Sequence, residues 1–220
     1  MDTRKYLAEL VGTFLFMTIG YASFAAFGAA SAPGLLVVPF SFGLGLLAAI
    51  FAVGHISGGH FNPAVTVAAV LDRRTSTQDA IGYILAQVVG AVAAAAVVFI
   101  VAGQAAVAAG VTKPGGGVSD IGALILEIVL AAGFILVILT SSKRAPMLAP
   151  LAIPLTLVAI HFASAPLTGA SVNPARSIGS ALLSADLGAL WIYIVAPIIG
   201  AAGGWALFRA IDGGGEEPLT

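Results

Sequence analysis

Phe61-Asn62-Pro63-Ala64-Val65 and Val172-Asn173-Pro174-Ala175-Arg176 are the two stretches that decide the fold. They share the tripeptide Asn-Pro-Ala and lie about half the length of the 220-residue chain apart. Asn is a favoured helix N-cap and Pro a favoured first helical residue. The apolar runs that follow, over 63–71 and 174–183, span only about half of a hydrocarbon core of about 30 Å, because a helix rises about 1.5 Å per residue. Each stretch therefore predicts a half-helix inside a membrane.

The composition indicates a membrane protein. Hydrophobic residues make up 60% of the chain and charged residues only 9%, whereas a soluble domain carries about 25% charged residues. The formal net charge of -1, with scattered Lys and Arg, offers no basic surface for nucleic acid. The chain has no cysteine, which excludes disulfides, thiolate chemistry and cysteine-ligated metals. A lipid bilayer is thus an expected partner, and nucleic acid is not.

Six apolar runs are long enough to cross a bilayer. They cover 6–27, 35–53, 80–102, 121–141, 148–163 and 187–208. Most Lys and Arg residues lie before the first run, between the second and third, between the fourth and fifth, and after the sixth. These positions all fall on one side of the membrane, and basic residues favour the cytoplasmic side. The pattern predicts a multi-pass protein of the cell (plasma) membrane with both termini in the cytoplasm.

The two halves of the chain repeat the same arrangement of three spans and one half-helix. Because three is odd, the second half enters the membrane from the opposite face, which is an inverted repeat. We expect one membrane channel domain over 1–220, with a first half at about 1–103, a flexible external connector at 104–120 and a second half at about 121–210. Non-helical backbone at membrane depth is tolerated only where it is buried in protein or lines a wet cavity. The two half-helices therefore predict an internal aqueous path.

Asn62 and Asn173 have side chains suited to that path. If the side-chain oxygen caps the half-helix, the amide nitrogen remains available to donate hydrogen bonds into the lumen. Each half-helix N-terminus adds a partial charge of about +0.5. Donors and positive dipole ends hold a water molecule by its oxygen and repel cations, so neutral molecules pass and charge does not. The alternative, that Asn-Pro is only a turn signal, explains one copy but not two at half-chain spacing.

These motifs resemble the signature loops of the aquaporin, or major intrinsic protein, family, and within it the water-selective branch of prokaryotic members. The resemblance rests on residues 54–66 and 173–177, on Ala8-Glu9-Leu10-Val11-Gly12-Thr13-Phe14, on Gly82-Tyr83-Ile84-Leu85-Ala86-Gln87, and on Pro197 followed by Gly200. It implies an all-α membrane protein of six transmembrane helices plus two re-entrant half-helices, arranged as an inverted 3+3 repeat in a right-handed bundle. It also implies a homotetramer with one pore per subunit and no cofactor.

The resemblance further implies a selectivity filter external to the Asn-Pro-Ala pair, made by Phe42, His161, Ala170 and Arg176. An aromatic ring, a histidine and an arginine form a narrow polar constriction typical of the water-selective branch, and the arginine repels cations. An interfacial, snorkelling arginine is the alternative for Arg176. Two departures leave other small solutes open: Ala170 replaces a slightly larger residue, and Ile194 stands where that branch usually has Trp.

His60, Gly58 and Gly59 are expected to line the cytoplasmic vestibule, where the carbonyls around the two glycines accept hydrogen bonds from water. His55 and His60 are spaced like a possible metal pair, but no cysteine or nearby carboxylate completes the ligand set, so no metal is expected.

Glu9 and Glu127 lie inside predicted spans, where a carboxylate is costly and is by default a functional candidate. They could form a proton-coupling pair. We favour a structural role as buried carboxylates that accept bonds from loop N–H groups, which is also what the resemblance implies.

Three functions remain after these observations. The first is a passive transmembrane water channel that excludes protons and ions, with water as the permeant. The second is a facilitator of other small neutral solutes, such as glycerol, hydrogen peroxide or ammonia. The third and weakest is a proton-coupled secondary transporter, which would also explain inverted repeats. An enzyme is not expected, because the sequence offers no nucleophile-base pair or metal set.

Overall fold

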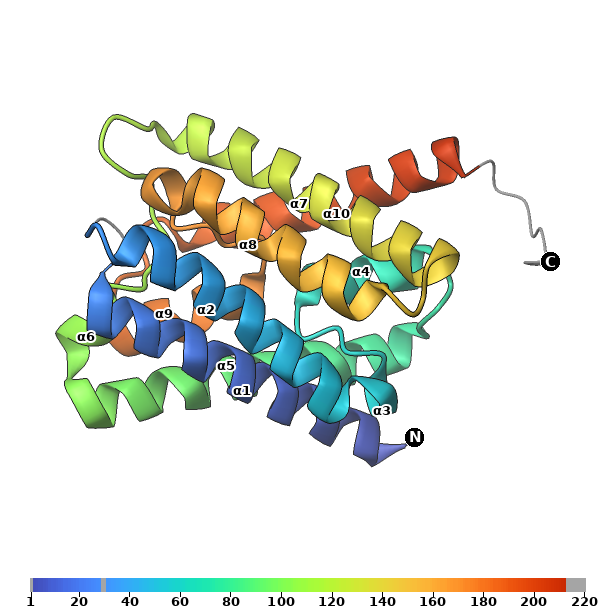
Figure 1. Ribbon diagram of the computed structural model, residues 1–220, viewed down its shortest axis with the longest axis horizontal. Helices are drawn as coiled ribbons and strands as arrows, with labels where there is room; N and C mark the ends of the chain where they lie inside the picture. The colour runs from blue at the N-terminus through green and yellow to red at the C-terminus, as the bar shows by residue number, and fades with distance from the viewer. Residues whose placement is uncertain (1, 29–30, 213–220) are drawn as a thin grey trace.

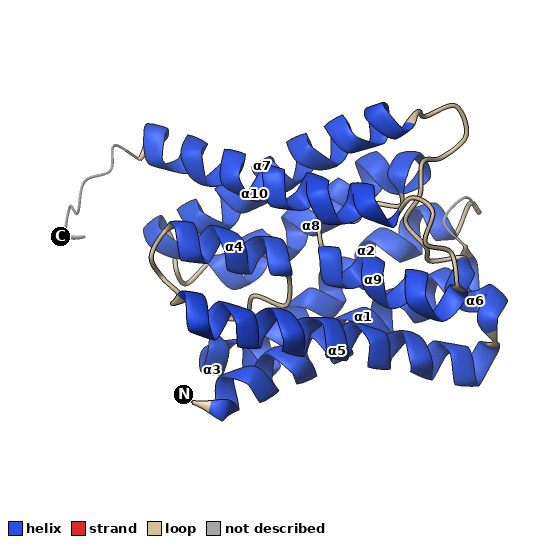
Figure 2. Cartoon of the chain, turned by 180° about the vertical axis from the view of Figure 1, so that it is seen from behind, coloured by secondary structure: helices blue, strands red, loops and turns tan. Residues whose placement is uncertain are grey.

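The computed structural model describes residues 2–28 and 31–212, and within these residues the chain forms helices and loops but no strand (Figures 1 and 2). The elements are α1 (Thr3–Phe27), α2 (Gly34–Ala49), a π-helix η1 (Ile50–Gly54), α3 (His55–Ser57), α4 (Pro63–Leu71), α5 (Thr77–Ala102), α6 (Gln104–Ala108), α7 (Asp120–Arg144), α8 (Ala149–Thr168), α9 (Pro174–Ser184) and α10 (Leu190–Ile211).

Six helical segments of the described chain are long and apolar enough to cross a membrane. They are α1, the continuous run from α2 through η1 to α3, α5, α7, α8 and α10. The predicted all-α architecture of six spans is thereby confirmed. The segment ends differ most at α8, which continues to Thr168 rather than ending near 163. A polar residue is tolerated there because the Ser164 hydroxyl donates to the Ile160 carbonyl at 2.8 Å within the same helix.

The connector between the halves is more ordered than the sequence suggested. The short helix α6 lies within the predicted loop 104–120. Gly103 ends α5 with φ 83, a left-handed conformation that glycine adopts without steric cost, and its N–H donates to the Phe99 carbonyl. The chain therefore reverses at Gly103 directly into α6.

The half-helices begin where the Asn-Pro pairs predicted. Asn62 precedes α4, and its side-chain oxygen accepts from the Ala64 N–H at 2.9 Å. Asn173 precedes α9, and its side-chain oxygen accepts from the N–H groups of Ala175 at 3.0 Å and Arg176 at 3.3 Å. These bonds satisfy donors that would otherwise be unpaired in the first turn.

The two halves exchange their half-helices. Within each half the first spanning helix packs against the other two, α1 against α2 and α5, and α7 against α8 and α10. The half-helix α4, however, packs against α10, and α9 packs against α5. In Figure 1, α4 and α9 lie toward opposite ends of the bundle. Each half-helix is thus held by the last helix of the other half, so neither half encloses the centre alone.

Close helix contacts depend on small residues, as the pair α7 and α10 illustrates. A Cβ added at Gly200 would lie 2.6 Å from the Ile128 carbonyl oxygen, which is too close for any side chain. Glycine therefore lets the two backbones touch, as small residues do in membrane helix pairs.

Polarity is distributed as a lipid environment requires. Large apolar side chains face outward, among them Ile100 at 81% exposed and Ile121 at 69%. Glu9, Gln87 and Glu127 are fully buried in the interior. Because lipid offers no hydrogen bonds, the polar groups gather where protein partners surround them.

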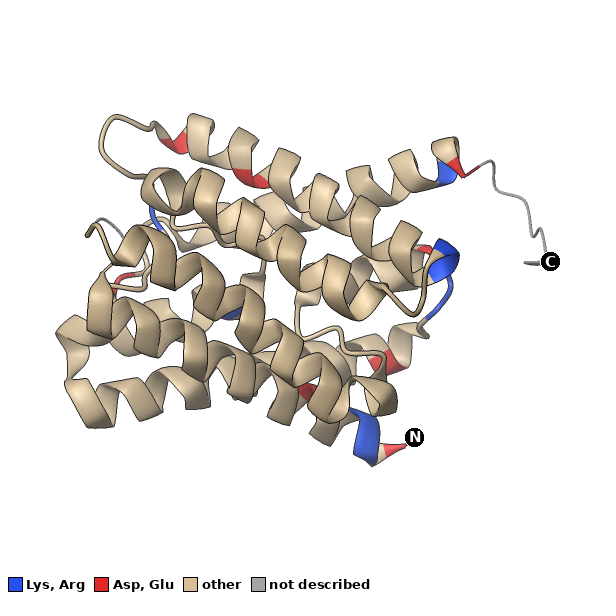
Figure 3. Ribbon diagram, viewed as in Figure 1, with Lys and Arg blue, Asp and Glu red and all other residues tan. Residues whose placement is uncertain are grey.

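Most Lys and Arg residues lie at one end of the bundle, where both ends of the described chain also lie (Figure 3). Lys143 and Arg144, at the end of α7, both bind the carboxylate of Asp212, which caps α10. The Arg144 contact is 2.6 Å between Nη2 and Oδ1. These ion pairs join the last helix to the loop between α7 and α8.

Replacing Asp212 with Asn tests this clamp through its pH dependence. Hydrogen bonds from Lys143 and Arg144 hold the pKa of Asp212 below its ordinary value of 3.8. A carboxylate whose pKa is lower in the folded state stabilises the fold above its unfolded-state pKa. This stabilisation is lost as the pH falls through the folded-state pKa. We expect Asp212→Asn to lower the thermal unfolding midpoint in detergent at neutral pH, with the difference shrinking below pH 3.8.

The control is Asp186→Asn, because the partner of Asp186, Lys113, is 59% exposed and such pairs contribute little. Equal shifts for both variants, or a shift for Asp212→Asn that persists in acid, would contradict the clamp.

Candidate functional site

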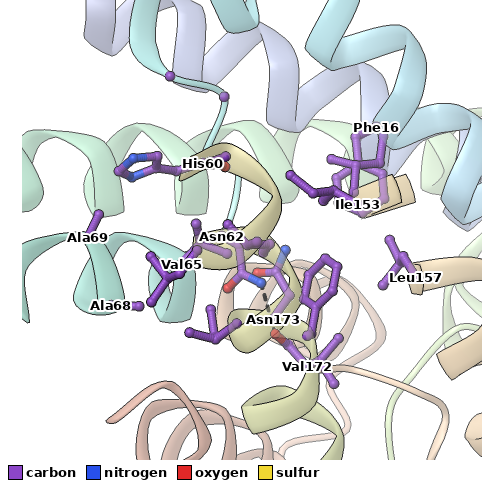
Figure 4. A pocket seen from close by; sticks show the side chains of 18 of the residues that line it. Phe16, His60, Asn62, Val65, Ala68, Ala69, Ile153, Leu157, Val172 and Asn173 are labelled. Carbon is purple, nitrogen blue, oxygen red and sulfur yellow. Dashed lines mark hydrogen bonds between the residues drawn. The ribbon is translucent and has the colours of Figure 1, made fainter. Parts of the chain in front are cut away.

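The N-termini of α4 and α9 meet at the centre of the molecule through reciprocal hydrogen bonds (Figure 4). The Asn62 Nδ2 group donates to the Val172 carbonyl at 2.8 Å, and the Asn173 Nδ2 group donates to the Phe61 carbonyl at 3.0 Å. Each amide nitrogen carries two hydrogens, so one is used between the loops and one remains. The sequence predicted wholly free amides; the structure shows that each also fastens one loop to the other.

The residues before each Asn adopt a conformation that aims their carbonyls at the opposite loop. Phe61 has φ 48 and Val172 has φ 45, in the left-handed region that costs a non-glycine residue about 1 kcal/mol. Such strain persists only where surrounding bonds hold it. The Phe61 N–H donates to Glu9 at 2.7 Å and the Val172 N–H donates to Glu127 at 2.8 Å. The two buried glutamates therefore hold the strained turns.

Glu9 accepts four hydrogen bonds. Its Oε1 accepts from the Ser57 hydroxyl at 2.6 Å and from the His60 N–H at 2.9 Å. Its Oε2 accepts from the Phe61 N–H and from the Gln87 amide, both at 2.7 Å. A carboxylate has about four acceptor positions, so Glu9 is saturated.

Glu127 makes the corresponding contacts in the second half. It accepts from the Thr168 hydroxyl at 2.7 Å and from the N–H groups of Ser171 at 3.0 Å and Val172 at 2.8 Å. Both carboxylates thus bind the loop that leads into a half-helix, one in each half.

A cavity of about 310 Å³ runs past the paired asparagines. This is large enough to hold several water molecules. The lining includes the polar side chains of His60, Asn62, Asn173, His161 and Arg176, together with Ser57, Arg74, Thr75, Ser142 and Ser171. The remaining lining is largely apolar and includes Phe16, Leu46, Val65, Ile135, Ile138 and Leu157. A molecule in this cavity therefore meets hydrogen-bonding groups set among apolar side chains.

Arg176 reaches the end of the cavity from the first turn of α9. Its Nη1 donates to the Gly110 carbonyl at 2.8 Å and its Nη2 to the Gly169 carbonyl at 3.0 Å. Its guanidinium carbon lies 5.3 Å from the ring centre of Phe24 and 5.4 Å from that of Phe42. The side chain is fully buried, and its Nε has no partner among the described residues. Buried polar groups normally find a protein or water partner.

His161 lies beside Arg176 at the same end of the cavity. Its ring stacks on Phe42, with 4.4 Å between ring centres and 25° between ring planes. Its Nδ1 is 3.0 Å from the Leu157 carbonyl. Because a carbonyl only accepts, Nδ1 carries the proton and Nε2 of the neutral ring is an acceptor. Within the described chain Nε2 has no partner.

Comparison with known families identifies the chain. The family model described as major intrinsic protein matches residues 1–208. The chain belongs to the major intrinsic protein family. The predicted resemblance is thereby confirmed, and membership in this family of passive channels agrees with the expectation that the chain is not an enzyme.

Individual relatives of this major intrinsic protein are bacterial. It is 41% identical to Aquaporin Z of Rhodopseudomonas palustris, with 96% of this chain and 95% of that protein covered. It is 42% identical to Aquaporin Z of Photorhabdus laumondii, covering 94% and 97%, and to Aquaporin Z of Brucella melitensis, covering 96% and 98%. The solved structure of the aquaglyceroporin from Plasmodium falciparum matches with a TM-score of 0.87, covering 96% of this chain and 97% of that chain. At 22% identity it shows the fold alone.

The four residues expected in a filter of this major intrinsic protein are not equivalent in the structure. Phe42, His161 and Arg176 line the end of the cavity. Ala170 is fully buried with φ 50 and is not among the lining residues. Ile194 is 38% exposed on α10 and is likewise absent from the lining. The departure at Ile194 therefore alters the outer face of the molecule rather than the cavity.

The other end of the cavity brings together the three residues expected in a vestibule, His60, Gly58 and Gly59. Gly58 has φ 92 and Gly59 has φ 66, which favours glycine at both positions. Arg74 also lines this end, and its Nη2 donates to the Leu139 carbonyl at 3.3 Å. Of the described residues, no group of three or more His, Asp or Glu residues could hold a metal ion.

Sequence reasoning gave no role to Gln87 or Arg74. Gln87 is an amide in the middle of an apolar span, and a polar residue at that depth was a usable signal. Arg74 follows the first half-helix directly in sequence, but only the turn after α4, with Arg73 at φ 60, directs it toward the cavity.

Replacing Gly20 with Ala tests how tightly the Phe42 ring packs against α1. A Cβ at Gly20 would lie 2.5 Å from Cζ of Phe42, closer than real Cβ contacts. The ring must then shift, and Phe42 lines the cavity. We expect Gly20→Ala to reduce the osmotic water permeability of proteoliposomes severalfold, as measured by stopped-flow light scattering. Gly133→Ala in α7 is the control, because a Cβ there meets nothing within 4 Å; equal fluxes in both variants would contradict the packing argument.

Proposed function

We propose that this chain is a passive transmembrane water channel that excludes protons and ions. One observation carries the proposal: buried donors and acceptors without protein partners line a cavity whose surface is largely apolar. They are the Nε of Arg176, the Nε2 of His161 and the second N–H of Asn62 and of Asn173. Water is small and both donates and accepts, so a file of water molecules can satisfy all of these groups in turn.

Exclusion of protons follows from the donors at the centre. The amides of Asn62 and Asn173 and the N-termini of α4 and α9 all present positive charge to the same point, about +0.5 for each helix end. A water molecule there is held by its oxygen, so it has no free lone pair to accept a proton from its neighbour. Arg176 adds a full positive charge to the cavity wall. Water passes, whereas hydronium and metal cations are repelled.

The ring of Phe42, His161 and Arg176 supports water over larger solutes. His161 and Phe42 stack on each other, and the Arg176 guanidinium lies 5.4 Å from the Phe42 ring centre, so three large side chains gather at one part of the cavity. The relatives named Aquaporin Z add support from sequence. The transporter hypothesis is weaker, because Glu9 and Glu127 are occupied by loop donors and serve in this proposal as anchors.

The proposal includes the setting of the channel. The two halves form one channel domain in the cell membrane, with both termini in the cytoplasm. The basic cluster around Lys143 and Arg144 supports this orientation, because basic residues favour the cytoplasmic side. By the family resemblance, four copies assemble, each with its own pore. Native mass spectrometry of the protein released from detergent micelles tests the stoichiometry; a monomer at all concentrations would overturn the tetramer but not the channel.

The deciding experiment compares two permeants in the same proteoliposomes. We expect fast osmotic shrinkage in an impermeant solute and little glycerol uptake, both followed by stopped-flow light scattering. His161→Gly is the matched variant, because removal of the imidazole widens the ring, and glycerol uptake should rise in it. Slow water flux in the wild type would overturn the channel, and glycerol uptake equal to that of the variant would overturn water selectivity.

A further inference from the structure

A chain of buried hydrogen bonds connects Glu9 to His60 in the cavity wall. Glu9 is saturated with donors, so Gln87 must turn its NH₂ group, not its carbonyl, toward the carboxylate. The Gln87 Oε1 is left without a partner among the described residues, which is consistent with the carboxylate dictating the amide orientation. The second N–H of Gln87 reaches the Thr66 hydroxyl oxygen at 2.9 Å. Thr66 therefore accepts from Gln87.

Thr66 has one proton to give and two further neighbours. Its hydroxyl oxygen is 3.1 Å from the Asn62 carbonyl oxygen and 3.0 Å from the Nδ1 of His60. The carbonyl can only accept. If Thr66 donates to Asn62, then Nδ1 of His60 must carry a proton and donate to Thr66, and all three contacts of the hydroxyl are hydrogen bonds. If Thr66 instead donates to His60, its contact with Asn62 joins two oxygens with no hydrogen between them.

We propose that Thr66, oriented by Gln87 and Glu9, is a positioning residue that fixes His60 as the Nδ1–H tautomer. The Nε2 of the neutral ring then presents a lone pair to water in the cavity, where His60 forms part of the wall (Figure 4). Nε2 has no hydrogen bond to the described residues. The proposal rests on the proposed water channel and adds one feature to it. At the inner end of the channel, the Nε2 of His60 accepts a hydrogen bond from water.

In this tautomer, His60 presents the same kind of group to the cavity as His161 does. His161 donates from Nδ1 to the Leu157 carbonyl, so it too offers Nε2 as an acceptor. The donors of Asn62 and Asn173 line the same cavity as the two histidines. Water held by its oxygen at the centre directs its hydrogens outward on both sides, and an acceptor at each end receives them. The reverse tautomer of His60 would place a donor against those hydrogens.

Nitrogen-15 solid-state NMR of histidine-labelled protein in liposomes at neutral pH tests the assignment directly. The chain has three histidines, and the His55→Gln variant identifies the signal of the exposed ring. We expect a protonated Nδ1 and an unprotonated Nε2 for His60 in the wild type. An Nε2–H tautomer would overturn the proposal without any variant being made, even if water flux is normal; absent water flux with the expected tautomer would instead overturn the proposed function.

Two variants test the role of Thr66. Thr66→Val removes the hydroxyl at nearly constant shape, and Thr66→Ser retains it. We expect Val to shift His60 toward the Nε2–H tautomer and to lower water permeability by about two- to tenfold, the rate equivalent of one neutral hydrogen bond. Ser should retain the wild-type tautomer and flux, and the His161 signals should be unchanged in both. An unchanged His60 tautomer in folded Thr66→Val would reduce Thr66 to a purely structural role and overturn the proposal.

Discussion

Replacing Arg176 with Val should open the channel to cations while leaving water flux fast. The guanidinium is fully buried and lines the cavity. A unit charge at about 5 Å, in surroundings with an effective dielectric constant of about 20, repels a cation by about 3 kcal/mol, which corresponds to about 100-fold. The variant also frees the carbonyls of Gly110 and Gly169, which then face the lumen as cation ligands. Potassium and proton conductance of reconstituted bilayers should rise by about that factor.

Arg176→Lys separates charge from geometry. Lysine keeps the positive charge but lacks the planar fork that spans two carbonyls. We expect cation exclusion to persist in Arg176→Lys and water flux to fall, because the ammonium is not held against the wall. Ion conductance that stays at the wild-type level in Arg176→Val would show that the central donors alone exclude cations.

Replacing Glu9 with Gln should strongly lower the free energy of unfolding. The carboxylate accepts four hydrogen bonds, two at each oxygen. Gln offers one acceptor oxygen and one NH₂ group, so two buried donors lose their acceptor. Each unsatisfied buried group costs about 1 to 3 kcal/mol, so we expect a loss of about 2 to 6 kcal/mol and a lower thermal unfolding midpoint in detergent.

Asp79→Asn is the matched control for Glu9→Gln. Asp79 accepts from the Tyr6 hydroxyl at 2.9 Å near the start of α5, but it holds no strained turn. We expect its midpoint to stay close to that of the wild type. A Glu9→Gln protein that unfolds at the wild-type temperature would contradict the anchor role and return the carboxylate to the list of candidate proton carriers.

The sequence predicted the spans and the starts of both half-helices because hydropathy and the Asn-Pro pair act locally. Asn62 and Asn173 mark their helix starts within one residue, since cap and first turn are set by neighbours in the chain. The π-helix Ile50–Gly54 left no comparable signal, because its widened turn depends on how α2 continues into the loop before Asn62. The helix α6 was missed because five residues are too few for a periodic pattern.

The candidate site was predictable as a set of residues but not as a set of contacts. The motifs indicate which residue types gather near the asparagines. The bond from Asn62 to Val172, and the shared roles of Thr66 and Gln87, depend on segments far apart in sequence that only tertiary packing brings together. Ala170 illustrates the limit: its place in the chain suggested the lumen, whereas in the structure it is fully buried with φ 50 and is not among the residues that line the cavity.

The exchange of half-helices between the two halves has a consequence for biosynthesis. When the first half leaves the ribosome, α4 has neither α10 to pack on nor Val172 to receive its amide, because both are still unmade. Lipid cannot replace these partners. We therefore expect the first loop to stay at the membrane surface until the last helix has been inserted, so that both loops enter together. The pore would then be completed as the final event of folding, and a ribosome stalled before α10 would yield a protein with spans but no channel.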